Sequence, residues 1–244
     1  MLVLINLDAA VERRSAMSRQ LQQLGLAFER VGVDLRCVRP AEAQAQIDAR
    51  FPGLQFDRQR LSNAEIGCWL SHLSAWRLLA QSNEPTCTVI EDDLQLLPGF
   101  AAAHAALSRR PQMDLVYLGT SSRNVSQRRR SAIEDLWVHE PVGIIFNTWG
   151  YSIRRDYVQR FFAAGPRRLR LPIDHFLGGK ARCAPPSIGV LQPAALVEDP
   201  VLGRASQIAP YTRRLDRSRV VEALRRRLLA SPLSAAYYAL YRYF

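Results

Sequence analysis

Long apolar runs are missing from this sequence of 244 residues. No window reaches the roughly 18 uncharged apolar residues that a membrane-spanning helix needs. The first apolar run, residues 2–7, follows no basic residue and is shorter than the core of a signal peptide. We therefore expect neither a transmembrane anchor nor secretion.

Cysteines are few and scattered. They form no Cys-x-x-Cys pair, and no histidine stands at zinc-finger spacing from them. This pattern predicts reduced thiols in a cytosolic protein without a structural zinc site. The four cysteines are Cys37, Cys68, Cys87 and Cys183.

Lysine is almost absent, although the chain is strongly basic. Lys180 is the single lysine among 33 basic residues, and the formal net charge is +11. Much of that charge lies near the C-terminus, where nine arginines from Arg204 onward face only Asp216 and Glu222. Arginine richness also follows genome base composition, and no nucleic-acid readout motif accompanies it, so we expect no nucleic-acid partner.

Apolar residues are plentiful, at 48% of the chain, which is enough for a full core. Strand patterns alternate with helix patterns, which predicts an α/β sandwich with a mainly parallel central sheet. We expect one domain over residues 1–210 and a separate tail over residues 211–244. Strands are expected at 2–7, 27–33, 86–90, 114–119 and 143–148, and helices from about residue 17 to Gly25 and at 40–49, 62–81, 100–109 and 156–164, with a loop at 123–130 and a turn at 149–151.

Three consecutive acids follow one of these strands. The apolar run at 86–90 breaks into Glu91, Asp92 and Asp93. Open α/β sheets bind ligands beyond the carboxyl ends of their strands, and strand alternation lets Glu91 and Asp93 point together while Asp92 points away. Two carboxylates on one side suit Mg²⁺ or Mn²⁺. The alternative is that the acids cap the next helix.

The helix expected at 62–81 begins with a capping box, because Ser62 is followed three residues later by Glu65. Glu65, Cys68 and His72 then share one stripe of this helix. His72 is either a hydrogen-bonded core residue or a contact of the ligand at the acid triplet, and both interpretations stay open.

The motifs taken together resemble glycosyltransferase family 25, the bacterial lipooligosaccharide glycosyltransferases, which also include collagen galactosyltransferase domains. The resemblance covers roughly residues 3–208, although residues 123–142 carry nothing of it. At Val33-Asp34-Leu35 this chain lacks the glycine that family members often have after the aspartate. The matching segments are Ile5-Asn6-Leu7-Asp8 with Arg13-Arg14, Leu61-Ser62 with Glu65-Ile66-Gly67-Cys68 and Ser71-His72, Glu91-Asp92-Asp93, Tyr117-Leu118-Gly119, Gly150-Tyr151, and Pro172-Ile173-Asp174-His175.

This resemblance implies a GT-A, Rossmann-like fold, a nucleotide-sugar donor and inversion at the anomeric carbon. A divalent ion, Mn²⁺ first and Mg²⁺ as the alternative, would stabilise the charge of the departing nucleoside diphosphate. Its predicted ligands are Glu91, Asp93 and His175. Inversion in one displacement needs a base, for which Asp174 is the candidate and Glu65 the reserve, with His72 nearby. The alternative for Asp174 is a helix N-cap.

Further residues are predicted to contact the two substrates. The donor nucleotide is expected near the end of the first strand, and an acceptor sugar is expected to stack on aromatic rings, although buried aromatics more often form core. The predicted donor contacts are Asn6, Leu7, Asp8, Arg13, Glu91, Asp92 and Thr120, with Arg14, Tyr117 and Gly119 as weaker candidates; the predicted acceptor contacts are Trp149, Gly150 and Tyr151.

The tail reads as a basic amphipathic helix at 217–230 followed by an apolar segment rich in tyrosine. Val220, Leu224 and Leu228 fall on one face of that helix, with arginines around them. This pattern predicts peripheral attachment to the anionic inner face of the cytoplasmic membrane, where a lipid-linked oligosaccharide acceptor would be presented. The alternative is that the tail packs on the catalytic domain or on a second copy of the chain, as in a homodimer.

The sequence therefore predicts an enzyme that transfers a hexose, galactose in the first instance, from a UDP-sugar to a lipooligosaccharide or lipopolysaccharide core acceptor. Two alternatives remain. One is a binding module that keeps the GT-A scaffold without turnover, and the other is a basic protein that binds membranes or nucleic acid.

Overall fold

The computed structural model describes most of the first of two compact units of the chain. The units are Met1–Ala205 and Ser206–Phe244. The residues described are 1–109, 113–120, 125–133, 135–142, 145–164, 168–180 and 186–203. The predicted helical tail lies outside them, so the tail and the domain boundary at residue 210 stay predictions.

An eight-stranded sheet forms the centre of the first unit, in the order β2-β1-β4-β9-β6-β11-β8-β7. Strands β1, β2, β4, β6 and β11 run in one direction, and β9 is inserted antiparallel between β4 and β6. The strands are β1 Leu2–Ile5, β2 Glu29–Val31, β4 Thr86–Glu91, β6 Leu115–Tyr117, β7 Val125–Ile133, β8 Leu136–Pro141, β9 Gly150–Arg154 and β11 Ile188–Gln192.

Two short ribbons accompany the main sheet. Strand β3 (Gln55–Phe56) pairs with β10 (Arg168–Leu169), and β5 (Leu94–Leu96) pairs with β12 (Leu196–Glu198). The β5·β12 ribbon brings the end of the described chain beside the acid triplet, because β5 follows that triplet directly.

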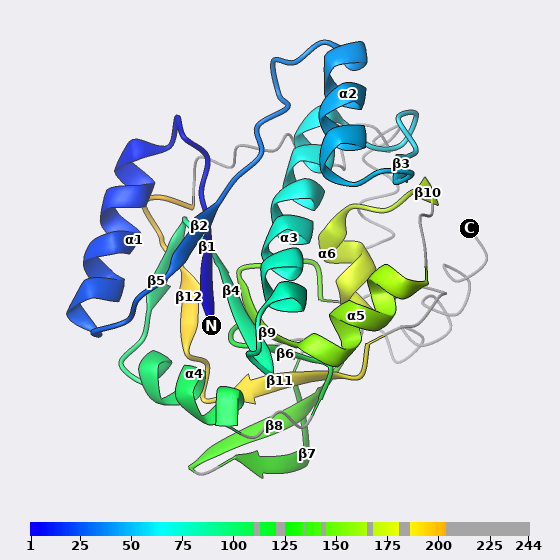
Figure 1. Ribbon diagram of the computed structural model, residues 1–244. Coiled ribbons are helices and arrows are strands. Elements are labelled where there is room, and N and C mark those ends of the chain that lie inside the picture. Colours follow the sequence, from blue (N-terminus) through cyan, green and yellow to red (C-terminus); the bar gives the residue numbers. More distant parts are fainter. Residues whose placement is uncertain are drawn as a thin grey trace, which may run out of the picture. The chain divides into compact units, whose positions relative to one another are not determined.

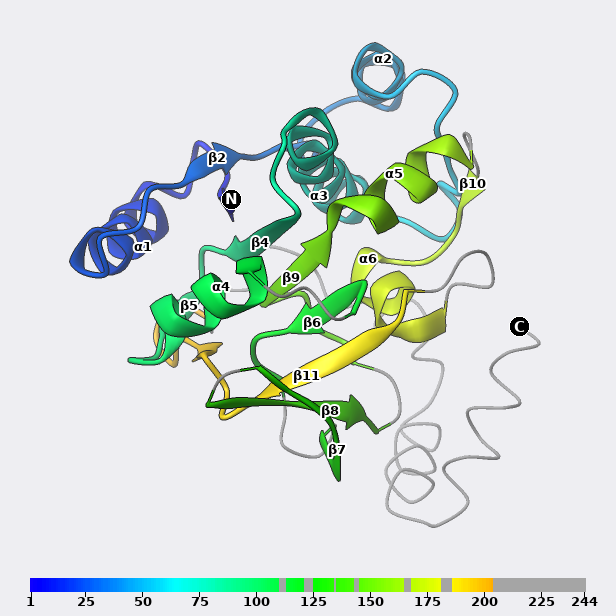
Figure 2. The same ribbon diagram turned by 60° about the horizontal axis from the view of Figure 1, so that its bottom comes forward.

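Helices cover both faces of the sheet (Figures 1 and 2). Strand β1 shows why, since Leu2 and Leu4 belong to one buried cluster and Val3 and Ile5 to the other. A strand with both faces apolar needs a layer on each side. One face packs against α1 (Val11–Gln23) and α4 (Phe100–Arg109), and the other against α2 (Pro40–Arg50), α3 (Asn63–Gln81), α5 (Arg155–Ala163) and the short α6 (Ile173–His175).

The predicted fold class, an α/β sandwich with a mainly parallel central sheet, is confirmed, and its GT-A type stays an implication of the family resemblance. The predicted helix at 100–109 coincides with α4, and the predicted stop at Gly25 is a glycine at φ +66° just past α1. The capping box is also present, since Ser62 Oγ accepts from the Glu65 amide while Glu65 Oε2 accepts from the Ser62 amide. No helix of the described segments is long and apolar enough to cross a membrane.

Two segment predictions were wrong. The basic stretch read as a loop at 123–130 contributes most of β7, which among the described strands pairs only with β8 and lies at the end of the sheet, where a strand can carry polar residues on its open side. The strand expected at 143–148 is displaced, because residues 145–148 have no regular structure and β9 begins at Gly150, where a turn was expected. Pairing with both β4 and β6 decides that position.

Helix α3 approaches the loop after β2 very closely at Gly67. A Cβ at Gly67 would lie 2.6 Å from the Val33 carbonyl oxygen. The contact is held by Ser71, whose hydroxyl accepts from the Val33 amide and donates to the Gly67 carbonyl, each over 2.9 Å. This approach fixes the height of α3 above the sheet, and with it the side chains that α3 directs toward the acid triplet.

We expect Gly67→Ala to lower the free energy of unfolding by about 1 kcal/mol. Overpacking against a backbone atom costs roughly 1–3 kcal/mol, which exceeds the gain of about 1 kcal/mol from better helix propensity. Gly99→Ala is the matched control, because a Cβ there meets nothing within 4 Å. Urea unfolding of both variants measures the difference, and equal stabilities would contradict the close approach.

Candidate active site

The acid triplet lies at an edge of the sheet where several strands end. Ile5 pairs with Val31 on one side and with Glu91 on the other, so β1, β2 and β4 reach the same level. Strand β9 runs the other way and begins at this level, with Gly150 opposite Ile90. The residues just after β1 and β4 and just before β9 therefore meet at one edge.

Asp92 turns toward β1 and α1. Asn6 Nδ2 donates to its Oδ2 over 2.6 Å, and Arg13 Nη1 donates to its Oδ1 over 3.1 Å. The residue is only 8% exposed. Burial raises the pKa of Asp92, and the hydrogen bonds from Asn6 and Arg13 oppose the shift. With both oxygens engaged, Asp92 joins β4 to β1 and α1.

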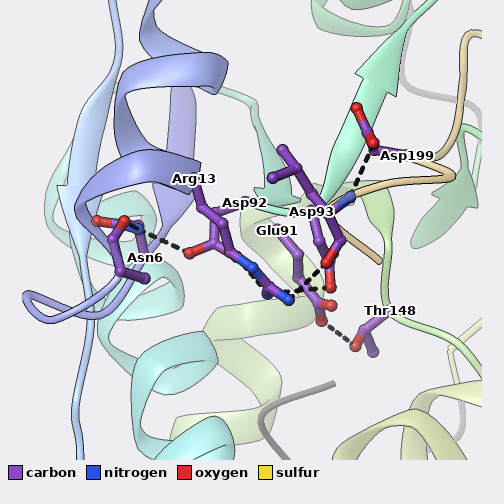
Figure 3. Close-up of polar contacts among 9 residues, drawn as sticks. Asn6, Arg13, Glu91, Asp92, Asp93, Thr148 and Asp199 are labelled. Atoms are coloured by element: carbon purple, nitrogen blue, oxygen red, sulfur yellow. Dashed lines mark hydrogen bonds and ion pairs between the residues drawn. The ribbon is translucent and has the colours of Figure 1, made fainter. Parts of the chain in front are cut away.

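Arg13 gathers three segments of the chain around one buried guanidinium. It contacts Asp92 and also Asp93, whose Oδ2 lies 3.3 Å from Nη1 (Figure 3). Its Nη2 donates to the Leu202 carbonyl over 2.8 Å. That carbonyl is placed by Asp199, whose Oδ1 accepts from the Leu202 amide over 2.9 Å. The segment after β12 is thereby fastened beside the acids.

Glu91 points to the other side, toward α3 and the segment before β9. The Thr148 hydroxyl donates to its Oε1 (Figure 3), and His72 Nε2 lies 3.5 Å from the same atom. Burial alone would raise the pKa of Glu91, but the polar contacts of His72 and Thr148 and the charge of Arg13 outweigh it, so the pKa lies below its usual value. Glu91 is therefore a partly buried carboxylate that stays charged.

Asp93 is the least satisfied of the three acids. Its Oδ1 is buried without a hydrogen-bond partner among the described residues. Burial, followed by the charge of Glu91, raises the pKa of Asp93 to about 7. The backbone here is fixed by the Asp199 amide, which donates to the Asp93 carbonyl over 2.9 Å. A cation at this position would relieve both the burial and the repulsion.

Asp174 is a fourth acid near the triplet. Burial raises the pKa of Asp174 to about 7, and the charges of Glu91 and Glu65 add to the shift. The N-cap of α6 is Pro172, so the alternative that Asp174 caps the helix is wrong. Its Oδ1 accepts from the His175 amide over 2.8 Å, while His175 Nε2 lies 4.0 Å from Oδ2.

Helix α3 supplies a stripe that faces these acids. Burial raises the pKa of Cys68, and the charges of Glu91, Asp174, Glu65 and Asp93 raise it further. The charges of four carboxylates from three separate parts of the sequence therefore act on one thiol. Ligand atoms of Cys68, His72 and Glu91 also lie within 4.8 Å of one another.

These residues fit a divalent cation on chemical grounds. Carboxylate oxygens are the ligands that Mg²⁺ and Mn²⁺ prefer, and Asp93 offers a buried oxygen that nothing in the described chain satisfies. The Cys68, His72 and Glu91 set is a second possible arrangement, and its sulfur and nitrogen atoms suit softer metals.

A cleft of about 260 Å³ opens at the ends of β1 and β2. Asp8 and Arg30 lie on its wall and pair with each other over 2.7 Å, and Gly32 and Ser74 also line it. Asn6 is buried beside the cleft wall, where its Oδ1 accepts from Arg30 Nη1 over 3.4 Å. The predicted donor contacts at the end of β1 thus divide into a buried residue, Asn6, and an exposed one, Asp8.

Without a bound cation, the acids should make folding weaker at higher pH. The pKa values of Asp93 and Asp174 are about 7 when folded, against 3.8 ordinarily, so the folded state holds protons that the unfolded chain releases. Their stabilising contribution is full below pH 4 and is lost as the pH rises through 7. We expect Asp174→Asn to raise the unfolding free energy by about 2 kcal/mol at pH 8 and by much less at pH 5.

Urea unfolding in the presence of a chelator tests this pH dependence. Asp48→Asn is the control, because Asp48 is exposed on α2 and its Oδ1 accepts only from Gln44. A stability difference between Asp174→Asn and the wild type that is equal at both pH values would contradict the raised pKa.

Comparison with known protein families identifies the family of this chain. Residues 1–177, well over half of the chain, match the family described as glycosyltransferase family 25 (LPS biosynthesis protein). The chain belongs to glycosyltransferase family 25.

Relatives of this family 25 chain include animal enzymes. Procollagen galactosyltransferase 1 of Danio rerio is 28% identical over 184 residues, which cover 71% of this chain and 30% of that protein. The inactive glycosyltransferase 25 family member 3 of Homo sapiens is 29% identical over 134 residues, covering 52% of this chain and 22% of that protein. The chain thus spans less than a third of the length of these relatives.

Among solved structures, a glycosyltransferase involved in glycosylation of the major capsid of PBCV-1 aligns with 66% of this chain and 63% of its own. The TM-score is 0.31 and the identity is 9%. A likeness at that level is too weak to support a conclusion about this family 25 chain.

Several residues predicted for substrate contact lie in other surroundings. Tyr151 is fully buried, with its ring stacked on His72, so the prediction that it stacks on a sugar was wrong. Gly150 offers no open face either, because a Cβ there would lie 2.4 Å from the Leu196 side chain. Trp149 is half-buried against the cluster on the α1 and α4 face.

Other predicted contacts stay predictions. Arg13 was predicted to contact the donor, yet its partners given above are acids and a carbonyl of the chain itself. Leu7 is half-buried beside Asn6. Thr120, also half-buried, donates to Asn147 Oδ1 over 3.4 Å, which places it near the segment before β9.

Three contributions to the site in this family 25 chain were not predicted from the sequence. Thr148 precedes β9 without any motif, and Asp199 and Leu202 lie more than 100 residues beyond the triplet that they brace. Trp76 had no predicted role, yet its indole donates to the Tyr151 hydroxyl. Of these residues, only Asp199 stood in a recognisable sequence pattern, because Asp-Pro is a common turn signal.

Proposed function

We propose that this chain is a metal-dependent, inverting glycosyltransferase that moves a hexose from a UDP-sugar to a saccharide acceptor. Galactose is the first candidate sugar, because procollagen galactosyltransferases are among the relatives. The observation that carries the proposal is the pair of acids Glu91 and Asp93 at the end of β4, with Asp93 Oδ1 buried and unpartnered among the described residues, while the charge of Glu91 also acts on Asp174.

Glu91 and Asp93 would hold the cation, with His175 as the further predicted ligand. Bound there, the cation would stabilise the negative charge that develops on the nucleoside diphosphate as it leaves. Asp92, Asn6 and Arg13 keep the triplet in place, because Asn6 and Arg13 donate to Asp92 and Arg13 also donates to Asp93. The cleft beside Asp8 is the proposed position of the nucleoside.

Asp174 would act as the base. A base must take the proton of the acceptor hydroxyl while the hydroxyl attacks the sugar opposite the leaving group. A pKa of about 7 suits this task, because the carboxylate is then partly available at neutral pH and a good proton acceptor when it is. Glu65 is the weaker candidate, since both of its carboxylate contacts here belong to the capping box.

A panel of nucleotide sugars tests the proposal. The full chain is mixed with each donor in Mn²⁺, in Mg²⁺ and in excess chelator, and release of the nucleoside diphosphate is measured. We expect release from one UDP-hexose, in the presence of the metal only. No release from any donor would instead favour the scaffold without turnover, an alternative kept open by the inactive human relative.

The acceptor is proposed to be a lipid-linked core saccharide of lipooligosaccharide or lipopolysaccharide, presented at the inner face of the cytoplasmic membrane. Support comes from the family description and from the basic, tyrosine-rich pattern of residues 211–244. The tail lies outside the described residues, so the proposal rests on sequence.

A chain ending at Pro210 is expected to lose binding to anionic vesicles while keeping donor hydrolysis. The reason is that each basic residue near an anionic surface contributes about 1 kcal/mol, and the tail carries most of the basic excess. Sedimentation with phosphatidylserine vesicles, compared with neutral vesicles, measures the loss. Unchanged sedimentation of the shortened chain would indicate that the tail packs on the protein or on a second copy.

A further inference from the structure

A buried chain of polar contacts lies behind Glu91. Trp76 Nε1 donates to the Tyr151 hydroxyl over 3.0 Å, and that hydroxyl lies 2.7 Å from His72 Nδ1. The other ring nitrogen, His72 Nε2, faces Glu91 Oε1 at 3.5 Å. Trp76, Tyr151 and His72 are all fully buried.

The direction of the hydrogen bond between Tyr151 and His72 follows from counting donors and acceptors. The indole of Trp76 can only donate, so it occupies a lone pair of the Tyr151 oxygen. If His72 Nδ1 also donated, the hydroxyl proton of Tyr151 would have no acceptor among the described residues. A buried hydroxyl without an acceptor is unfavourable, so the hydroxyl donates to Nδ1.

This direction fixes the tautomer of His72. When Nδ1 accepts a hydrogen bond, the proton of the neutral ring sits on Nε2. Nε2 then directs its N–H toward Glu91 Oε1 at 3.5 Å, a contact longer than a well-formed hydrogen bond, and it forms no hydrogen bond in the described part of the chain. The His72 ring is restrained through its neighbours. Trp76 makes T-shaped ring contacts with Tyr157 and with Phe161, and it donates to the Tyr151 hydroxyl that contacts His72.

The two donors around Glu91 converge on one of its oxygens. Both Thr148 and His72 address Oε1. No described residue donates to Oε2. Glu91 is 25% exposed at its side chain, so one oxygen is held by the protein and the other is left for a ligand.

We propose that Trp76 and Tyr151 are positioning residues, which hold His72 as an Nε2–H donor so that Glu91 presents its Oε2 to the cation. The inference rests on the proposed function, since it takes Glu91 as a ligand of the metal. It assigns His72 to the support of a ligand and not to the metal itself. While Nε2 carries the proton it has no lone pair for a metal, so coordination by the Cys68, His72 and Glu91 set would require His72 to change its tautomer.

Nitrogen NMR of the full chain tests the tautomer directly. The protein is labelled with ¹⁵N-histidine, and the His72 signal among the four histidines is assigned from its absence in His72→Gln. We expect the shift of a bare nitrogen at Nδ1 and that of a protonated nitrogen at Nε2, in the protein without metal. A bare Nε2 would overturn the proposal whatever the enzyme transfers.

Manganese affinity tests the role of the tautomer. Loss of a residue that orients a metal ligand typically lowers affinity by about 10- to 100-fold, and we expect that loss in His72→Leu and about 10-fold in Tyr151→Phe. His72→Gln should stay within about 3-fold of wild type, because the glutamine amide can donate from the place of Nε2. Cys68→Ala, the control, should bind Mn²⁺ as the wild type does.

The outcomes separate a donor from a ligand. If His72→Gln loses as much Mn²⁺ affinity as His72→Leu, or if Cys68→Ala also loses Mn²⁺ affinity, His72 coordinates the metal and the proposal is overturned. Circular dichroism of each variant excludes unfolding, and the tautomer of the wild type decides the matter if His72→Leu does not fold. If the wild type binds no Mn²⁺ yet shows the Nε2–H tautomer, the proposed function fails and the hydrogen-bond chain stands.

Discussion

Asp93→Ala is expected to lower metal-dependent release of the nucleoside diphosphate on the order of 10³-fold. Asp93 supplies the buried oxygen that nothing in the described chain satisfies, and the charge on the leaving group has to be met at the moment it develops. Removing one such electrostatic contact typically costs about 10²- to 10³-fold, and a lost cation removes several. Steady-state kinetics in saturating Mn²⁺ measures the effect.

The variant should remain folded, which makes the kinetic loss interpretable. Removing a buried acid whose pKa is raised to about 7 relieves repulsion with Glu91, so the unfolding free energy should not fall at pH 8. Asp48→Ala, on the exposed side of α2, should keep wild-type kinetics. Wild-type turnover in Asp93→Ala, or of the wild type in excess chelator, would remove the metal from the mechanism.

Asp174→Asn is expected to lower transfer to the acceptor by about 10²- to 10⁴-fold, because asparagine cannot take the proton of the attacking hydroxyl. The binding of UDP in Mn²⁺ should change little, since the amide keeps the size of the side chain and the contact with the His175 amide. Transfer assays and UDP titrations on the same preparation separate the two effects.

The two readouts also distinguish the roles available to Asp174. Near-full transfer in Asp174→Asn would show that the acid is not the base and would bring Glu65 forward. A parallel loss of Mn²⁺ affinity would place Asp174 among the metal ligands instead, together with Glu91, whose charge raises the pKa of Asp174.

Much of the scaffold could be predicted because it depends on local patterns. The capping box of Ser62 and Glu65 and the stop at Gly25 are decided within a few residues. The acid triplet could be placed at the sheet edge because the strand before it is apolar on both faces. Local patterns did not reveal β7, whose polar residues suit a loop and an edge strand equally.

The surroundings of the acids depend on contacts between distant segments, which a single sequence does not show. Asp92 pairs with Asn6 and Arg13 from the start of the chain, and Arg13 is also held by Leu202 near the end of the described part. Tyr151 was predicted to stack on an acceptor sugar, because the sequence around an aromatic residue that follows Trp-Gly does not indicate that the residue is buried. Strand β9, which carries Tyr151, lies between β4 and β6, and this pairing directs the Tyr151 side chain inward, toward His72.

The central claim is that the acids at the end of β4 hold the cation on which the donor depends. Calorimetric titration of Mn²⁺ into the full chain, in the presence of UDP, tests it most directly when wild type, Asp93→Ala and Asp48→Ala are compared. The account predicts one Mn²⁺ site in the wild type and in Asp48→Ala, and none in Asp93→Ala. Equal Mn²⁺ binding by Asp93→Ala and the wild type would contradict it.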